Sequence, residues 1–322
     1  MRKKYICTYF NENFINRGCA LIDSLFKTNE NFVLYVLALD DVTFNYLKER
    51  YSPENMVILS MTNYSSFFKI NPEKYLDKKQ FFFSITPNLC QWVINQYSEI
   101  DVLLYLDADV YIFADLDIIY KEFKAYSVGA CSHRHNKFVK KISNHYGEYN
   151  VGVNLFRNDV IGKKCISNWK KDCDDWYPNK PNYPLSYFSD QIFLDQWPKT
   201  YKEHFLEIKN IGVNVAPWNA INYKFKKINN KIYVNNSPLI IYHFSSLVKT
   251  EQSVWNTNAG YCFFKLNNEL RKIYINYIEH VISSKFKTEK VVELEFKGST
   301  KKKIFHSLFG LIFNNKIKFK NA

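Results

Sequence analysis

The chain has 322 residues, of which 47% are hydrophobic and 18% aromatic, so it can bury a sizeable core and lacks the composition of a disordered protein. Its formal net charge of +13 is uneven: residues 285–322 carry ten Lys and three Glu, a net +7, which leaves +6 for the first 284 residues. Because the body is only mildly basic and its Lys residues are spread over ordinary helical faces, we expect no nucleic-acid partner.

The first part of the chain alternates apolar runs with segments of helical spacing. Strands are predicted at residues 5–10, 32–39, 56–61 and 102–106. Helices are predicted at residues 14–26 and after Asp40 or Asp41, either of which can be an N-cap. Thr86 and Pro87 predict a further helix start, as N-cap and first helical residue. This alternation is typical of a mainly parallel sheet covered by helices.

The later part continues this pattern and ends in a basic tail. Strands are predicted at residues 127–131, 151–156 and 239–244, and helices at residues 159–176, 190–197 and 263–283. In the tail, Ile304, Leu308 and Leu311 share one helical stripe, with basic residues at both ends. Such a segment can dock on an anionic membrane, contact a partner or pack on its own domain.

The segment around Asp107-Ala108-Asp109 carries the most informative pattern, because a fully apolar strand ends there. Alternate residues of an extended segment point the same way, so both carboxylates can face one ligand. In open α/β sheets, ligands bind at the carboxyl ends of strands. Two adjacent carboxylates repel each other unless a cation joins them, and oxygen ligands near phosphate favour Mg²⁺ or Mn²⁺. The alternative is that the two Asp merely begin a loop, but the long apolar strand favours a site.

Four blocks of the chain together resemble the GT-A glycosyltransferases, specifically the retaining family-8-like group that includes bacterial lipooligosaccharide galactosyltransferases and glycogenin-like enzymes. The D-x-D strand is the first block. The others are an Asn-x-Gly strand at Asn150, an Asp-Gln pair at residues 190–191, and the segment from His243 to Lys249, which resembles the group's His-x-x-Gly-x-x-Lys. Most of the chain, from about residue 5 to 250, is covered.

The resemblance implies an α/β chain with the GT-A, Rossmann-like fold, in which helices flank a mainly parallel central sheet. We expect the catalytic domain at residues 1–260, with a nucleotide-sugar-binding half at about 1–125 and an acceptor half at about 126–260. Residues 261–322 would form a small C-terminal appendage with a helix and the basic amphipathic tail.

The resemblance also implies a metal and diphosphate site. Asp107, Asp109 and His243 would hold Mn²⁺ or Mg²⁺, and Asp107 and Lys249 would contact the donor diphosphate. The chemistry agrees, because neutral His is a good ligand for divalent metals and a Lys near phosphate offsets the charge of the leaving group. By itself, a His such as His243 at the end of an apolar strand is more often structural; its spacing to Lys249 favours function.

The same resemblance places further residues at the donor and acceptor. Asp190 and Gln191 would lie beneath the anomeric carbon as catalytic residues, with Asp190 binding sugar hydroxyls, and Asn150 would touch the donor sugar or acceptor. Thr8 and Tyr9, at the end of the first strand, are where this fold usually stacks the nucleotide base. Each of these residues also has a simpler explanation. Asp190 and Gln191 can begin a helix, Asn150 can begin a strand, and Thr8 and Tyr9 can pack in the core.

Three features depart from the group's pattern. Ser246 stands where the group has Gly, no Pro-Trp follows Lys249, and the group's donor-binding Arg upstream of the D-x-D has no counterpart. Thr86-Pro87-Asn88 occupies the place of that Arg. We therefore expect the diphosphate to be held in a different way.

The function implied is metal-dependent transfer of a sugar from a nucleotide donor, with UDP favoured, to a glycan or lipid-linked acceptor in cell-surface polysaccharide or lipopolysaccharide synthesis. Enzymes of this group retain the configuration of the anomeric carbon, so the resemblance implies retention here. One alternative is a non-catalytic GT-A-like binding or scaffold protein, against which the presence of both Asp, the His and the Lys speaks. The other is a Mg²⁺-dependent phosphatase of the haloacid-dehalogenase kind, which would carry its nucleophilic Asp on the first strand.

The expected compartment is the cytoplasm, with peripheral contact at the inner face of the plasma membrane through residues 299–320. The seven Cys are scattered without a C-x-x-C pair, which predicts reduced buried thiols and no zinc site or disulfide framework. The apolar stretch at the start is too short for a signal peptide, and no apolar run approaches a membrane span in length.

Overall fold

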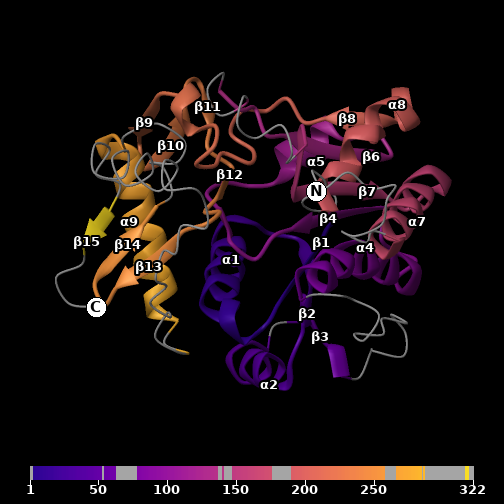
Figure 1. The fold of residues 1–322 in the computed structure, drawn as a ribbon, viewed down its shortest axis with the longest axis horizontal. Helices are drawn as coiled ribbons and strands as arrows, with labels where there is room; N and C mark the ends of the chain where they lie inside the picture. Colours follow the sequence, from indigo (N-terminus) through magenta and orange to yellow (C-terminus); the bar gives the residue numbers. More distant parts are fainter. Residues whose placement is uncertain are drawn as a thin grey trace, which may run out of the picture.

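A seven-stranded sheet forms the centre of the molecule in the computed structural model (Figure 1), which describes residues 3–52, 54–62, 78–136, 140, 147–175, 190–257, 266–284, 286 and 316–318. The strand order is β3-β2-β1-β4-β7-β6-β8. The strands have the bounds β1 Lys4–Phe10, β2 Phe32–Ala38, β3 Met56–Ser60, β4 Val102–Leu106, β6 Val128–Ser132, β7 Tyr149–Arg157 and β8 Phe205–Glu207.

The direction of the strands decides what meets at each edge. β3, β2, β1 and β4 are parallel, and β6 and β8 are parallel to each other, whereas β7 runs antiparallel to both β4 and β6. The expected mainly parallel sheet is thus confirmed. Because β7 is reversed, its first residues lie at the edge where β1, β2, β4 and β6 end.

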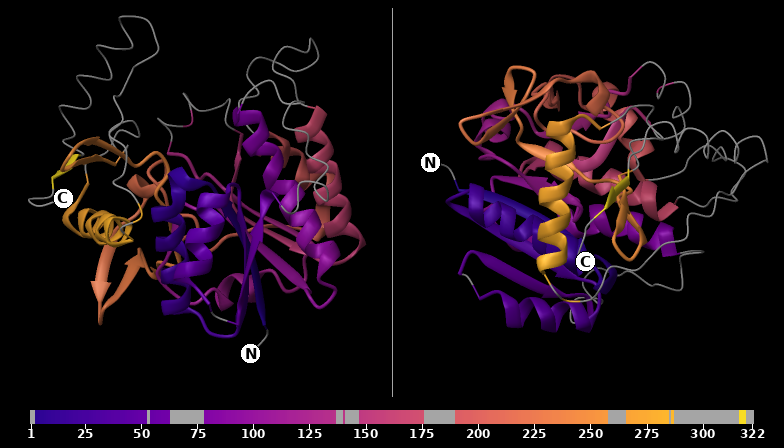
Figure 2. Two further views of the ribbon diagram at one scale, coloured as in Figure 1. Left: turned by 90° about the horizontal axis from the view of Figure 1, so that it is seen from below. Right: turned by 90° about the vertical axis from the view of Figure 1, so that its left-hand side faces the viewer.

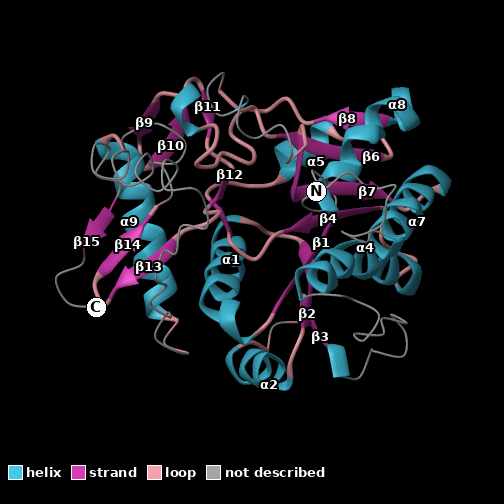
Figure 3. Cartoon of the chain, viewed as in Figure 1, coloured by secondary structure: helices cyan, strands magenta, loops and turns pink. Residues whose placement is uncertain are grey.

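Helices cover both faces of the sheet (Figures 2 and 3). One face packs against α4 (Lys78–Gln96) and α7 (Val160–Asp175). The other packs against α1 (Ile15–Thr28), α2 (Asp41–Arg50) and α5 (Asp117–Glu122). The alternation of β1 explains this arrangement, because its odd-numbered residues join the first core cluster and its even-numbered residues the second. Both faces are apolar, as expected for strands that are covered on both sides.

A third core cluster lies beside α1 and includes α9 (Asn268–Ser283), which Figure 2 shows beyond α1 from the sheet. Three small sheets surround it: β5 (Val110–Ile112) with β12 (Ile241–His243); β9 (Phe225–Ile228), β10 (Lys231–Val234) and β11 (Ser237–Pro238); and β13 (Val248–Glu251), β14 (Val254–Asn256) and β15 (Lys316–Lys318). The remaining helices are short: η1 Glu12–Phe14, η4 Asp190–Gln196, α8 Trp197–Tyr201, η5 Lys202–His204 and η6 Ala220–Asn222.

One predicted helix start is wrong, and one predicted helix is of another type. α4 begins at Lys78, so Thr86 is not its N-cap and Pro87 lies inside the helix. A proline there removes one helical hydrogen bond, and close by Asn88 Nδ2 donates to the carbonyl of Ser84 at 2.7 Å. The predicted helix at residues 190–197 is a 3-10 turn, η4, followed by the short α8.

The predicted amphipathic tail lies mostly outside the described residues. Its described part, β15, pairs with β14, and Ile317 is buried in the third core cluster. Within the described part of the chain, no helix is long and apolar enough to cross a membrane.

Candidate active site

The D-x-D turn is held in place by backbone hydrogen bonds on two sides. Asp107 N donates to the carbonyl of Gly152 on β7 at 3.1 Å, and the carbonyl of Asp109 accepts from Phe244 N at 2.9 Å. Tyr105 Oη also donates to Asp107 Oδ1 at 2.8 Å. The two carboxylates therefore sit at the end of β4 with a fixed backbone and one oriented side chain.

His243 meets the two carboxylates because β12 pairs antiparallel with β5, directly after the D-x-D. Its Nε2 lies 3.0 Å from Asp109 Oδ1 and 3.7 Å from Asp107 Oδ2. The side chain of His243 is 4% exposed, whereas those of Asp107 and Asp109 are 31% and 16% exposed. The structure thus brings together three predicted metal ligands from segments more than 130 residues apart in sequence.

The imidazole of His243 and the two carboxylates shift one another's pKa values. Burial by itself would lower the pKa of His243, but the charge and hydrogen bond of Asp109 outweigh it and raise that pKa. For Asp109, burial is likewise outweighed by His243, with a smaller contribution from Arg17, so its pKa is lowered. Burial and the charge of Asp109 raise the pKa of Asp107. The charge of His243 therefore stabilises the Asp109 carboxylate, whereas that of Asp107 stays disfavoured, and a bound cation would offset the repulsion between the two.

The donor set fits a divalent metal. One ligand atom from each of Asp107, Asp109 and His243 can lie within 4.8 Å of the other two. Two carboxylate oxygens and one imidazole nitrogen suit Mn²⁺ or Mg²⁺, with remaining positions for water or phosphate oxygens.

A cavity of about 430 Å³ opens beside the carboxylates. Its lining consists of the D-x-D residues, aromatic side chains and two amides from the loop after β1: Tyr9, Phe10, Asn11, Asn13, Phe14, Leu39, Phe82, Tyr105, Asp107, Ala108 and Asp109. The volume lies within the range of sites for small molecules and cofactors, and an apolar wall with a few polar groups is typical of them.

Thr8 and Tyr9 lie differently with respect to this cavity. Tyr9 is one of the lining residues, and its Oη donates to the carbonyl of Phe82 at 2.9 Å and lies 3.1 Å from Thr86 Oγ1. Thr8 is fully buried and is not among the lining residues, and within the described part of the chain its Oγ1 has no hydrogen-bond partner.

Asp190, Gln191 and Asn150 come together on the β7 side of the site. Asn150 Nδ2 donates to Gln191 Oε1 at 3.3 Å. Burial, and then the charge of Asp107, raise the pKa of Asp190 well above its usual range. The carbonyl of Asp190 accepts from Trp169 Nε1 at 3.2 Å, which fixes the start of η4.

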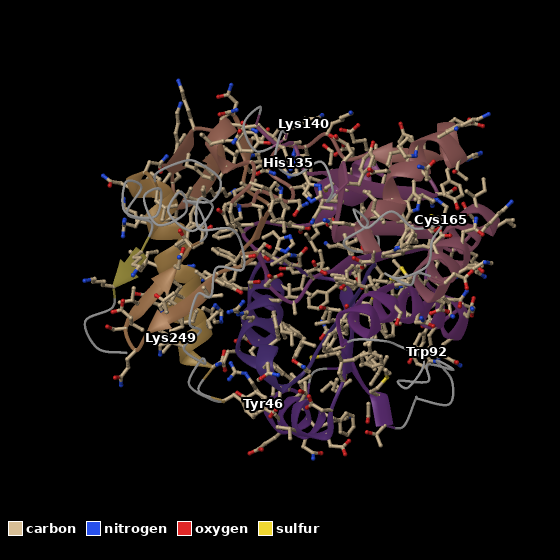
Figure 4. All side chains as sticks on the ribbon, viewed as in Figure 1. Tyr46, Trp92, His135, Lys140, Cys165 and Lys249 are labelled. Carbon is tan, nitrogen blue, oxygen red and sulfur yellow. The ribbon has the colours of Figure 1, made fainter. Side chains whose placement is uncertain are left out.

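Lys249 lies on β13, in the left-hand part of Figure 4, and is 4% exposed. Among the described residues, its ammonium group makes no hydrogen bond or ion pair. The loop before β13 contacts α1, because Arg17 Nη2 donates a hydrogen bond to the carbonyl of Leu247 at 2.9 Å. That loop begins at Phe244, beside Asp109.

Sequence reasoning missed three residues near the site. Arg17, in the first turn of α1, lowers the pKa of Asp109, and Asn214 contacts His243. Trp218 packs edge-on against the His243 ring, with centroids 5.2 Å apart. Arg17 follows the first strand at the ligand-binding edge and could have been noticed on that ground. Asn214 and Trp218 lie in an irregular segment with no periodic pattern to indicate their position.

Comparison with known proteins gives distant relatives. No family model matches the chain. It is 22% identical over 277 residues to YfnD of Bacillus subtilis (strain 168), covering 85% of this chain and 87% of YfnD. It is 25% identical over 247 residues to YfnF of the same organism, covering 74% and 80%. Both relatives are described as uncharacterized proteins.

Solved structures give a clearer result. The galactosyltransferase LgtC, in complex with donor and acceptor sugar analogues, superposes with a TM-score of 0.54 at 15% identity, over 87% of this chain and 95% of LgtC. The apo form of the glycosyltransferase GlyE of Streptococcus pneumoniae TIGR4 gives a TM-score of 0.51 at 16% identity, over 100% of this chain and 66% of GlyE. The predicted resemblance is therefore confirmed at the level of architecture, and the chain has the GT-A glycosyltransferase fold.

Proposed function

We propose that the protein is a metal-dependent glycosyltransferase that uses a nucleotide-sugar donor. The observation that carries this proposal is the convergence of Asp107, Asp109 and His243 beside a cavity of about 430 Å³ at the carboxyl edge of the sheet. A metal cluster alone would suit many hydrolases. Its position next to an aromatic-lined cavity, in a GT-A fold, is what a nucleotide diphosphate requires.

The donor nucleotide would occupy this cavity, with its base against Tyr9 and neighbouring aromatic side chains and its diphosphate toward Asp107. A Mn²⁺ or Mg²⁺ ion held by the three ligands would neutralise charge on the leaving diphosphate. Lys249 would add a second positive charge there. The support for this role is the position of Lys249 in the His243–Lys249 segment and the burial of the residue, which is 4% exposed.

The sugar would lie between the metal site and the start of β7. Asp190 would bind sugar hydroxyls, Gln191 would lie at the reacting face of the anomeric carbon, and Asn150 would contact the sugar or acceptor. Their support is the hydrogen bond between Asn150 and Gln191 and the influence of the Asp107 charge on Asp190. Because Gln191 is a weak nucleophile, we favour retention by front-face attack of the acceptor hydroxyl, with a phosphate oxygen of the leaving group taking its proton.

The wider function is inferred from the fold neighbours. LgtC was solved with donor and acceptor sugar analogues, which supports a glycan acceptor here. We propose a UDP-sugar donor and a glycan or lipid-linked acceptor in cell-surface polysaccharide or lipopolysaccharide synthesis. The enzyme would then work in the cytoplasm, with peripheral contact at the inner face of the plasma membrane through the part of residues 299–320 that precedes β15.

The test is a panel of UDP-, GDP- and other nucleotide sugars, with and without Mn²⁺, that follows both binding and slow donor hydrolysis. Asp109→Asn is the test variant and Asp175→Asn, a surface carboxylate on α7, the matched control. Metal-dependent turnover of one donor that is lost in Asp109→Asn and kept in Asp175→Asn is expected. Metal-dependent binding without turnover would favour a binding or scaffold protein, and no binding at all would overturn the proposal.

A further inference from the structure

A chain of buried amide side chains connects the metal site to the sugar side of the active site. His243 Nδ1 lies 3.3 Å from Asn214 Oδ1. Asn214 Nδ2 donates to Asn150 Oδ1 at 3.0 Å, and Asn150 Nδ2 donates to Gln191 Oε1 at 3.3 Å. Asn214 thus hydrogen-bonds to Asn150 and lies within hydrogen-bonding distance of a predicted metal ligand, His243.

The direction of this chain is set by a backbone group. Gly152 N–H can only donate, and it lies 3.0 Å from Asn150 Oδ1, so the oxygen of that amide faces Gly152 and Asn214. The group of Asn214 that faces this oxygen must therefore be its NH₂. Its own oxygen is then turned to His243 Nδ1. Because Asn214 Oδ1 is an acceptor, Nδ1 of His243 must carry the ring proton. Nε2 is then free to bind a metal between the two Asp.

The Asn214 side chain has little freedom to turn away. The residue is fully buried and has a left-handed backbone with φ of 56°, which Asn tolerates better than most residues. The backbone carbonyl of Asn214 accepts a hydrogen bond from Asn219 Nδ2 at 3.1 Å. The next residue, Val215, pairs with β12 on both sides of Tyr242, through Val215 N to Ile241 O and His243 N to Val215 O. The segment that carries Asn214 is thereby attached to the strand that carries His243.

We propose that Asn214 is a positioning residue with two separate roles. Its oxygen orients His243 for metal binding, and its NH₂ group holds Asn150 against Gln191. Together the two contacts fix the position of the metal relative to the sugar. The second role rests on the proposed glycosyl transfer. The first does not, because metal binding can be measured without a donor.

Two substitutions separate the roles. Asn214→Asp keeps an acceptor for His243 Nδ1 but has no donor for Asn150, whereas Asn214→Gly removes both contacts and suits the positive φ. Asn230→Gly, in the β9–β10 turn with φ of 62°, is the matched control. Mn²⁺ affinity is measured by the EPR signal of free Mn²⁺, with and without UDP, and thermal unfolding checks that each variant is folded.

We expect Asn214→Gly to bind Mn²⁺ about 10–100-fold more weakly than wild type, and Asn214→Asp to bind it nearly as well as wild type. Turnover of the donor identified by the panel should fall at least about tenfold in both variants. Unchanged Mn²⁺ affinity in a folded Asn214→Gly, or no Mn²⁺ binding by wild type, would overturn the orienting role. If wild type turns over no donor, glycosyl transfer fails and the holding of Asn150 for the sugar fails with it, while the Mn²⁺ titrations still decide the orienting role.

Discussion

Gly152 lies where any side chain would collide with His243, one of the three predicted metal ligands. A Cβ at this position would be 2.6 Å from both Cε1 and Nδ1 of that ring and 2.9 Å from Asn150 Oδ1. Ordinary carbon contacts begin near 3.5 Å, so Gly152→Ala leaves a shortfall of about 0.9 Å. The strand cannot easily move away, because the Gly152 carbonyl is bonded to Asp107 N and its N–H to Asn150.

The expected response is that the His243 ring gives way. Metal–ligand distances tolerate only about 0.2 Å, so a shift of several tenths of an ångström takes Nε2 out of range of an ion held by Asp107 and Asp109. We expect Gly152→Ala to bind Mn²⁺ about 10–100-fold more weakly. Overpacking should also lower the free energy of unfolding by about 1–3 kcal/mol.

Gly129→Ala on β6 separates these two effects. Its Cβ would lie 3.0 Å from two carbons of the Phe123 ring, in the core and away from the metal ligands, so it should lose stability yet keep its Mn²⁺ affinity. Calorimetric Mn²⁺ titration and urea unfolding are measured on both variants. A folded Gly152→Ala protein with wild-type Mn²⁺ affinity would refute the reasoning that this glycine makes room for the ligand.

Two further predictions concern single charged groups. Burial would raise the pKa of Asp23, but hydrogen bonds from His280 and Tyr51 and the charge of Arg50 outweigh it and lower that pKa. The resulting stabilisation is present above the unfolded pKa of about 3.9 and is lost as pH falls through the lower native pKa. Asp23→Asn should therefore lower the free energy of unfolding by about 1 kcal/mol at pH 7, and the difference from wild type should shrink steadily as pH falls below about 3.9, as measured by urea titration; a difference that does not change with pH would contradict this. Lys249→Met should weaken nucleotide-diphosphate binding about tenfold or more and leave binding of the free nucleoside unchanged, as measured by calorimetry; equal losses for both ligands would contradict a diphosphate contact.

The sequence was sufficient to predict the fold and part of the site, for identifiable reasons. Strands buried on both faces read as continuous apolar runs, and β4 ends abruptly in two carboxylates. The place of Asp107 and Asp109 therefore follows from local pattern. The place of His243 does not, because its partner strand β5 is more than 120 residues away, and only the resemblance to a known group linked the two segments.

Other features depend on tertiary context that no local pattern records. The start of α4 lies eight residues before Thr86, although Thr-Pro is a good helix start, because core packing of Ile85 and Leu89 can outweigh the local preference of a proline. Asn214 lies between a bridge and a turn, where neither the helical nor the strand period applies. Its role can only be seen once His243 and Asn150 are in place beside it.

The reversed direction of β7 explains why Asn150, a predicted sugar contact, lies close to the predicted metal ligands after β4. Because β7 is antiparallel to β4, its start lies beside the end of β4, with Leu106 opposite Val153 and Asp107 N bonded to the carbonyl of Gly152. A parallel neighbour would have placed its start, and thus Asn150, at the far edge of the sheet. Register here is fixed by burial on both faces, since a slip of one residue would exchange the two core clusters. The positions of Asp107, Gly152 and Asn150 relative to one another are thereby set by the pairing of β4 with β7.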